Sequence, residues 1–173
     1  HIQARNEQGA GFMADGYARL SGRPGVCVLI SGPGVTNACT AMGQSFADSI
    51  PVLVISSTTP SNSLGKGWGC LHEVTDLEAV TRPLTALSAT ASSAGEIEEL
   101  IGQAFSIFAS ERPRPVHIAI PIDVLATPVI DTWQRRAEPA RPAPNSPAIR
   151  KAAALLRQAK RPLIYVGGGA VST

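Results

Sequence analysis

The sequence contains little cysteine, few aromatic residues and little charge. Its three cysteines form no CxxC pair and no cysteine–histidine ligand spacing, which indicates neither a disulfide framework nor a structural zinc site. This usage is typical of a reduced, cytoplasmic protein. No apolar run approaches the roughly 18 residues of a membrane-spanning helix, so we expect no membrane partner. The net charge of +2 comes from scattered lysines and arginines, which gives no basis for nucleic-acid binding.

The first residue is His1, so an initiator methionine is missing, and no signal peptide follows. We therefore expect the chain to be part of a longer polypeptide. Hydrophobic residues make up 44% of it, and glycine (16) and proline (14) are plentiful. That composition favours short strands and small-residue helices joined by tight turns, and it suffices for a globular core.

The first part of the sequence predicts a helix followed by a βαβ unit. Asn6 is a suitable N-cap for the helix, and Gly22 with Pro24 is typical of its end. Two apolar runs have the length of strands buried on both faces, and the helix between them makes these strands parallel. The expected elements are a helix at 6–20, a strand at 25–31, a Gly-Pro-Gly turn at 32–34, a helix at 35–49 and a strand at 50–57.

The following segment predicts an α/β fold with a three-layer parallel sheet and helices on both faces. A polar, glycine-punctuated loop at 58–72 has a length that is usually functional. His117 lies within an apolar strand, which favours a packed core histidine. The further elements are a short helix at 76–80, a strand at 84–87, a helix at 94–110 and a strand at 114–123. The apolar face of the longer helix consists of Ile97, Leu100, Ile101, Ala104, Phe105 and Phe108.

Proline enrichment predicts a domain boundary. Six of the 14 prolines lie between Pro121 and Pro147. We therefore expect a first domain at 1–122, a linker at 123–147 and the start of a second α/β domain at 148–173. In this last segment a helix precedes the apolar strand "RPLIYV" and a glycine turn.

Three segments occur in a fixed order: "RNEQGAGFMADGYARLSG", "GVCVLISGPGVTNACTAMGQSFADSIPVLVISS" and "RPRPVHIAIPIDV". Together they resemble the pyrimidine-binding domain of thiamine-diphosphate-dependent enzymes. The branch to which they are most similar is acetolactate synthase and its relatives acting on 2-oxo acids. The resemblance extends from Arg5 to Val124 and implies an N-terminally truncated pyrimidine-binding domain that uses thiamine diphosphate.

Glu7 is the first catalytic candidate. In the family, the glutamate that resembles Glu7 hydrogen-bonds a nitrogen of the pyrimidine ring and helps to remove the thiazolium proton. The resemblance therefore implies a catalytic and cofactor-binding Glu7 whose carboxyl is shielded from water and has a raised pKa. From the residues alone, the favoured interpretation of Glu7 is a first-turn acid that compensates the helix dipole, and the resemblance reverses this preference.

Five further cofactor-binding candidates follow the first strand. Gly32, Pro33 and Gly34 resemble the family turn that lets the backbone approach the pyrimidine ring, although the same residues also make a tight βα turn. Asn37 and Gln44 lie on a helix that, in the family, runs near the cofactor and the subunit interface. Amides that face solvent are the alternative for these two residues.

His72 is the second catalytic candidate and departs from the acetolactate synthase pattern. Those enzymes carry Phe-Gln where this chain has Leu71 and His72, and the segment "SLGKGWGCLHE" resembles guanidino-2-oxo acid decarboxylases. A histidine can supply the proton that yields an aldehyde after decarboxylation. A histidine on a surface loop is the alternative. Asn6 also departs, because the family usually has a histidine before the glutamate.

The resemblance implies parts that this sequence does not contain. In the family, Mg²⁺ holds the diphosphate through a separate domain, and "ADG" at 14–16 is not that motif because it falls inside a helix. No metal ligand is therefore assigned here. The family cofactor lies between subunits, so the expected partner is a second subunit of a homodimer or homotetramer, and the chain alone should be inactive. FAD is suggested by the family's central domain alone.

Three functions stay open. The leading prediction is a decarboxylating carboligase on 2-oxo acids, similar to acetolactate synthase. A non-ligating decarboxylase of the guanidino-2-oxopentanoate type is the alternative that His72 favours. A non-catalytic nucleotide-binding or scaffold module is the third, because "GPG" and the terminal "GGGA" are generic turns.

Overall fold

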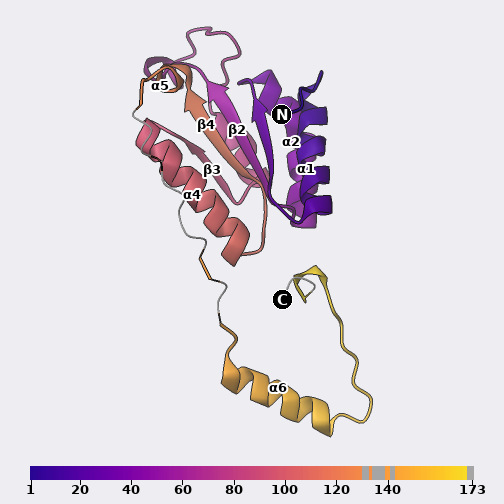
Figure 1. Ribbon diagram of the computed structural model, residues 1–173. Coiled ribbons are helices and arrows are strands. Elements are labelled where there is room, and N and C mark those ends of the chain that lie inside the picture. Colours follow the sequence, from indigo (N-terminus) through magenta and orange to yellow (C-terminus); the bar gives the residue numbers. More distant parts are fainter. Residues whose placement is uncertain (130–132, 134–138, 141–142, 171–173) are drawn as a thin grey trace. The chain divides into compact units, whose positions relative to one another are not determined.

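The computed structural model describes residues 1–129, 133, 139–140 and 143–170. Its contacts divide the chain into two units, residues 1–139 and 140–173 (Figure 1). Part of the linker predicted at 123–147 lies outside the described residues. The last described helix of the first unit is α5 (Ile122–Leu125), a short helix that the sequence pattern did not predict.

The predicted helix and βαβ unit are present. α1 (Glu7–Ser21) begins where Asn6 accepts a hydrogen bond from the backbone N–H of Gln8 at 2.9 Å. It ends at Gly22, whose φ of +66° is a left-handed conformation that favours glycine because glycine has no Cβ. β1 (Gly25–Leu29), α2 (Pro33–Asp48) and β2 (Val52–Thr58) follow, and β1 and β2 pair in parallel as expected. α2 begins two residues before the predicted 35 because proline is well suited to the first helical position.

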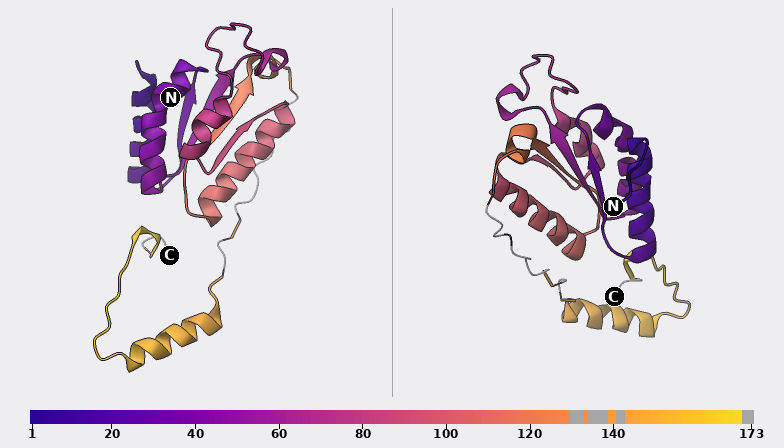
Figure 2. Two further views of the ribbon diagram at one scale, coloured as in Figure 1. Left: turned by 180° about the vertical axis from the view of Figure 1, so that it is seen from behind. Right: turned by 45° about the horizontal axis from the view of Figure 1, so that its top comes forward.

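The sheet contains four parallel strands in the order β1-β2-β4-β3, with β3 (Leu87–Thr90) at the far edge and β4 (Val116–Pro121) inside. α1, α2 and α3 (Leu77–Thr81) cover one face, and α4 (Ala94–Ser110) lies on the other (Figure 2). This is the three-layer α/β fold that the sequence predicts. A 3₁₀ turn, η1 (Ser61–Ser63), follows β2 in the loop.

Two large core clusters and a small third one fill the spaces between the layers, because successive strand residues point to opposite faces. The cluster under α1 and α2 includes Ala14, Cys27, Leu29, Ala38, Met42, Val52 and Val54. The cluster under α4 includes Leu53, Ile97, Leu100, Ala104, Ile107, Val116, Ile118 and Ile120. The predicted apolar face of α4 is therefore correct at three buried positions and at Ile101 and Phe108, which pack against the cluster. Phe105 is 36% exposed, and Ile107 is buried in addition.

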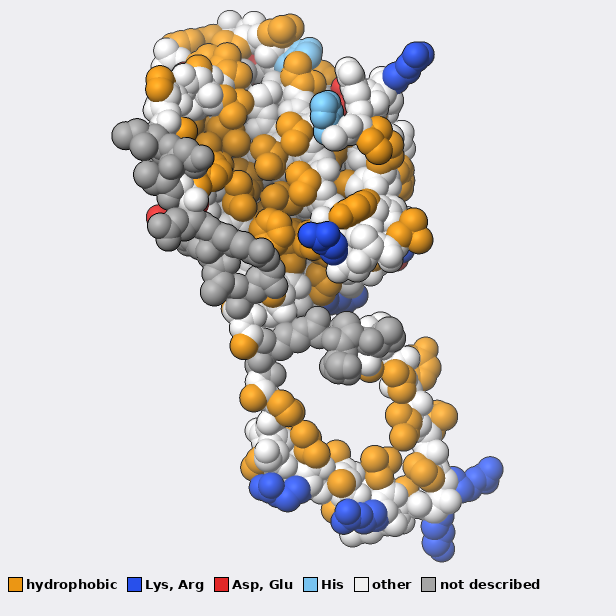
Figure 3. Space-filling model, viewed as in Figure 1, with side chains coloured by type: hydrophobic (Ala, Val, Ile, Leu, Met, Phe, Trp, Pro, Cys, Tyr) orange, Lys and Arg blue, Asp and Glu red, His pale blue; other side chains and the backbone are white. Residues whose placement is uncertain are grey.

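Two strand predictions in the first unit are wrong. The strand expected at 84–87 begins only at Leu87, because the proline-containing segment Arg82–Leu84 forms a 3₁₀ turn, η2. β1 is not buried on both faces, since Val26 and Val28 are 53% and 73% exposed. The core cluster under α4 contains residues of β2 and β4, residues of β3 pack against it, and none of its members comes from β1. Hydrophobic side chains consequently gather on the open part of this sheet face (Figure 3).

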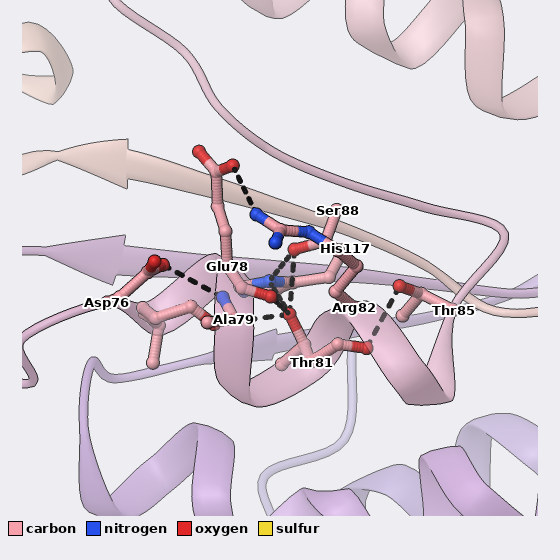
Figure 4. Close-up of polar contacts among 9 residues, drawn as sticks. Asp76, Glu78, Ala79, Thr81, Arg82, Thr85, Ser88 and His117 are labelled. Carbon is pink, nitrogen blue, oxygen red and sulfur yellow. Dashed lines mark hydrogen bonds and ion pairs between the residues drawn. The ribbon is translucent and has the colours of Figure 1, made fainter.

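His117 is the second residue of β4 and is completely buried, which confirms the prediction of a packed core histidine. Its Nε2 atom is 2.8 Å from the Ser56 hydroxyl, and its Nδ1 atom is 2.9 Å from the Thr81 hydroxyl. Ser88 adds a hydroxyl 3.3 Å from Nδ1 (Figure 4). Burial lowers the pKa of His117 to about 4, so the imidazole is neutral near pH 7.

The second unit contains α6 (Ser146–Gln158), which begins where the Asn145 side chain accepts from the backbone of Ala148 at 3.1 Å. The strand predicted at 161–166 is wrong: these residues form no strand and are exposed. A single strand needs a neighbour for its hydrogen bonds, and the described part of this unit supplies none. The glycine turn contains η3 (Gly168–Ala170). Among the described residues, no helix has the length and apolar character needed to cross a membrane.

Candidate functional site

The carboxyl ends of three parallel strands bring the candidate residues to one edge of the sheet. β1 ends shortly before the Gly32–Gly34 bend, β2 ends at the start of the 59–72 loop, and β4 ends before Asp123. Ligand sites in open α/β sheets form outside this edge. α2 begins at the same edge because it follows β1 directly.

α1 and α2 pack side by side in a constant register, and this register places Glu7. Three pairs, each one helical turn further along, are separated by 30 residues in sequence: Glu7–Asn37, Gly11–Ala41 and Asp15–Ser45. In the middle pair, a Cβ added to the glycine would lie 2.7 Å from the alanine Cβ. The missing side chain therefore permits the close approach of the helices that brings the other two pairs into hydrogen-bond distance.

Glu7 is half-buried, and its Oε2 atom accepts a hydrogen bond from Asn37 Nδ2 at 3.0 Å. The Asn37 amide, followed by the backbone N–H of Glu7 itself, lowers the pKa of this carboxyl; desolvation opposes them, and the charge of His72 assists. The predicted rise in pKa is therefore wrong for this chain. The physical reason is that hydrogen bonds to the carboxylate outweigh the weak desolvation of a side chain that remains open on one side.

Gly32 is required at the bend for two independent reasons. Its φ is +57°, a conformation that residues with a Cβ rarely adopt. A Cβ at this position would also collide with the carbonyl oxygen of His72. Pro33 is exposed and fills the first position of α2, where a missing N–H does no harm.

Gly34 keeps open the space between the bend and the carboxylate. A Cβ there would lie 2.7 Å from Ile30 Cγ2 and 3.5 Å from Glu7 Cγ. An alanine at this position would therefore collide with Ile30 and come into van der Waals contact with the Glu7 side chain. The bend thus presents backbone, and no side chain of its own, toward Glu7.

His72 approaches the same place from the loop after β2. Its φ of +59° is unusual for a residue with a side chain. Its Nδ1 atom is buried and has no hydrogen-bond partner among the described residues. The structure thus brings together Glu7, Asn37, His72 and the two glycines of the bend. A buried polar atom that lacks a partner indicates either strain or a missing ligand.

Gln44 does not join this group. Its Nε2 atom donates to Asp48 at 2.8 Å, two helical turns beyond Asn37. Asp48 also pairs with Arg19 at 2.7 Å, and Arg19 pairs with the buried Asp15 at 2.6 Å. Sequence reasoning missed this network, although the spacing of four residues between Asp15 and Arg19 was a signal for it.

Two further acidic residues organise the loop and were also missed. Asp123 accepts hydrogen bonds from the backbone N–H and the hydroxyl of Ser61, at 2.9 and 3.1 Å. Glu73 binds the backbone of the second half of the loop. The first contact joins residues 62 positions apart, and no local pattern predicts a contact of that kind.

The chemical capacity of the site follows from its groups. A carboxylate held by an amide can accept or exchange a proton with a polar ring, and an adjacent imidazole can hold a second proton. The bend offers close approach to the backbone. Throughout the described ranges, no cluster of three or more His, Cys, Asp or Glu residues could hold a metal ion. The carboxylate and the imidazole suit an organic ligand with hydrogen-bonding ring atoms.

Comparison with known proteins points to one family of enzymes. Residues 1–80 match the family described as thiamine pyrophosphate enzyme, N-terminal TPP binding domain. A protein named probable 2-ketoarginine decarboxylase, from Pseudomonas aeruginosa, is 59% identical over 99% of this chain and 31% of its own length. The acetolactate synthase isozyme 1 large subunit of Escherichia coli is 42% identical over 99% of this chain and 30% of its own length.

A eukaryotic relative shows the same pattern. The mitochondrial acetolactate synthase catalytic subunit of Saccharomyces cerevisiae is 36% identical over 97% of this chain and 26% of its own length. The chain thus spans less than a third of the length of each of these relatives.

Proposed function

We propose that the chain holds the pyrimidine ring of thiamine diphosphate in a 2-oxo acid decarboxylase, because residues 1–80 match the N-terminal TPP binding domain of thiamine pyrophosphate enzymes. The observation that carries this proposal is the hydrogen-bonded Glu7 beside the bend. A first-turn acid that served only the helix dipole would not need Asn37 and two space-saving glycines around it.

The residues present fit a pyrimidine ring. The ring has nitrogen acceptors and an amino group, which match a carboxyl, backbone groups of the bend and a free imidazole nitrogen. The Nδ1 atom of His72 is buried without a partner in the described part of the chain, so a ligand atom would relieve its desolvation. The space that a Cβ at Gly34 would fill lies beside Glu7.

In this proposal, Glu7 binds a ring nitrogen and exchanges a proton with it, and Asn37 holds the carboxyl in place. When bound, thiamine diphosphate supplies the electron sink for cleavage of the bond to the carboxylate of a 2-oxo acid. Proton donation requires a protonated carboxyl, whereas the pKa of Glu7 is lowered in the isolated chain. Exclusion of water by the ligand and a covering subunit would raise that pKa toward the working pH.

The reaction that we favour is decarboxylation without ligation, on a guanidino-2-oxo acid. Two observations support this order over the carboligase reading that the sequence alone put first. His72 lies at the bend beside Glu7, where its carbonyl oxygen packs against Gly32, and an imidazole is a side chain that can donate a proton to the product. The identity to the relative named as a 2-ketoarginine decarboxylase is 59%, against 42% to the acetolactate synthase isozyme.

The wider organisation is part of the same proposal. We expect a pyrimidine-binding domain at 1–122, a linker at 123–147 and the start of a central domain at 148–173. Mg²⁺ and the diphosphate would be held by residues outside this chain, in a second subunit of a homodimer or homotetramer. FAD rests on resemblance to acetolactate synthases alone, and no described residue argues for it.

Calorimetry on the complete protein tests the binding step. Thiamine diphosphate with Mg²⁺ should bind to the unchanged protein, and Glu7→Gln should lower turnover by roughly 10²–10⁴-fold because it removes the proton exchange. Glu99→Gln, an exposed carboxylate on α4, is the matched control and should change nothing. Undiminished turnover of Glu7→Gln would end the assignment, and absence of cofactor binding would favour a scaffold module.

Product analysis separates the two reactions. With a guanidino-2-oxo acid as substrate, the complete protein should release carbon dioxide and the corresponding aldehyde. Formation of acetolactate from pyruvate as the main product would establish the carboligase instead.

A further inference from the structure

The loop segment 64–72 is exposed and rich in glycine, yet it presents His72 at one defined place. Gly65, Gly67 and Gly69 have φ values of +67°, +66° and +75°. Trp68 between them is 63% exposed, so the tip gains little from burial. A segment with so many glycines loses much conformational freedom on ordering, and some other interaction must hold it in shape.

The carboxylate of Glu73 supplies that interaction. Its Oε1 atom accepts from the backbone N–H of Gly67 at 2.9 Å, and its Oε2 atom accepts from Gly69 at 2.7 Å and Cys70 at 2.9 Å. The backbone N–H of Glu73 itself donates to the carbonyl of Cys70 at 3.0 Å. Within the described residues, no other side chain hydrogen-bonds to the backbone of 64–72. Ionised acceptors make stronger hydrogen bonds than neutral ones, so this contact dominates the loop.

The charge state of Glu73 is consistent with this role. Desolvation acts to raise the pKa of Glu73, but hydrogen bonds from the backbones of Cys70, Gly69, Gly67 and Trp68 outweigh it and hold the pKa below its usual value. The carboxylate is therefore ionised at neutral pH.

The turn that Glu73 closes ends at His72. That residue has a φ of +59°, and its carbonyl oxygen packs against Gly32. A residue in a sparsely populated conformation keeps it only when its surroundings impose it. Here the surroundings are the closed turn on one side and the bend on the other.

We infer that Glu73 is a positioning residue, whose carboxylate closes the Gly67–Cys70 turn and thereby holds His72 against the Gly32 bend beside Glu7. This inference rests on the proposed function only in taking Glu7 and His72 as the site. Glu73 orders the loop that carries His72, although its side chain contacts neither the reacting atoms nor the bend.

Nuclear magnetic resonance of the ligand-free 173-residue chain tests the structural half. In Glu73→Ala, amide exchange of Gly69 and Cys70 should accelerate by about tenfold, the factor for one hydrogen bond to a charged group. The nuclear Overhauser contacts between His72 and Gly32 should disappear. Glu73→Gln, which retains one oxygen acceptor, should lie between, and Glu99→Gln should match the unchanged chain. Retention of the His72–Gly32 contacts in both Glu73 variants would overturn the inference, even if the amide exchange changed.

A double-mutant comparison in the complete enzyme tests the functional half. If Glu73 acts through His72, then Glu73→Ala and His72→Asn should each lower turnover, and the double variant should be no worse than the poorer single one. Independent, multiplicative losses would contradict a positioning role. Loss of cofactor binding by the unchanged enzyme would defeat the proposed function and leave the resonance result standing, so the two failures are distinguishable. If Glu73→Ala fails to fold, Glu73→Gln carries both tests.

Discussion

His117 and His72 lie in two parts of the first unit whose polar groups are arranged in opposite ways. His117 is 0% exposed, and both ring nitrogens have hydroxyl partners at 2.8 and 2.9 Å. His72 has a buried Nδ1 atom without a partner among the described residues, on a backbone with positive φ. The first group is chemically complete, whereas the second is left with a hydrogen-bonding position to fill.

The two acidic residues of α1 repeat the contrast. Asp15 is 5% exposed and accepts hydrogen bonds from Arg19 and Ser45. Glu7, two turns earlier, is half-buried and has Asn37 as its one side-chain partner in the described chain. Buried polar groups whose bonds are all made stabilise the fold, and those with unmet capacity are candidates for ligand binding. We call His117 and Asp15, whose hydrogen bonds are all made, closed groups, and His72 and Glu7, which have unmet capacity, open groups. Mutations should therefore affect stability in the closed groups and activity in the open ones.

Replacement of His117 gives the largest expected effect on stability. His117→Ala leaves a cavity and removes partners from Ser56 and Thr81, so the free energy of unfolding should fall by about 3 kcal/mol. Urea unfolding followed by circular dichroism measures it. The exposed His1→Ala is the control. A loss below about 1 kcal/mol would show that His117 and its hydroxyl partners contribute little to the stability of the fold.

Acid should weaken the closed group without any mutation. The folded pKa of His117 is lowered to about 4, below the unfolded value of about 6.5, so the unfolded chain binds the proton first. Its contribution is therefore complete above pH 6.5 and declines as the pH falls toward 4. From pH 7.5 to pH 5 the loss should be about 2 kcal/mol.

This pH effect is attributable to one residue because the partners of His117 are hydroxyl groups, which do not titrate in this range. His117→Asn should have a flatter stability profile between pH 7.5 and pH 5. An equal slope in both proteins would assign the acid sensitivity to other groups.

Replacement of Gly32 tests the contact between the bend and His72, and Gly22, which has a similar φ, is the control. Gly22→Ala meets no atom within 4 Å, so it should lower the free energy of unfolding by about 1 kcal/mol through its positive φ alone. Gly32→Ala adds a collision with the His72 carbonyl and should lower it by about 2 kcal/mol. Equal losses in thermal or urea unfolding would mean that His72 does not press on the bend.

The sequence could predict much of this arrangement wherever the signal is local. The caps Asn6 and Gly22, the βαβ unit and the burial of His117 all follow from residue type and spacing. Glu7 and the glycine bend could be found because they resemble a known motif. Contacts across long separations could not, and the hydrogen bond of Asp123 to Ser61 is an example.

The errors have physical causes of the same kind. Gln44 was a reasonable candidate on its helix, but its distance from Asn37 is set by helix geometry and its partner by the Asp48 side chain. The exposure of Val26 and Val28 depends on how far α4 extends across the sheet, which no strand pattern encodes. The lowered pKa of Glu7 depends on a register between two helices.

The smallest effect on stability should come from replacement of His72, which tests the contrast with His117 directly. His72→Asn keeps a residue that tolerates positive φ and removes the imidazole, so the free energy of unfolding should change by less than about 0.5 kcal/mol. If the proposed decarboxylation is right, the same change in the complete protein should lower turnover, because it removes the proposed proton donor. Urea unfolding and product assays on the same variant give both numbers. A stability loss comparable to that of His117→Ala would place His72 among the closed groups, and the contrast between the two histidines would then be void.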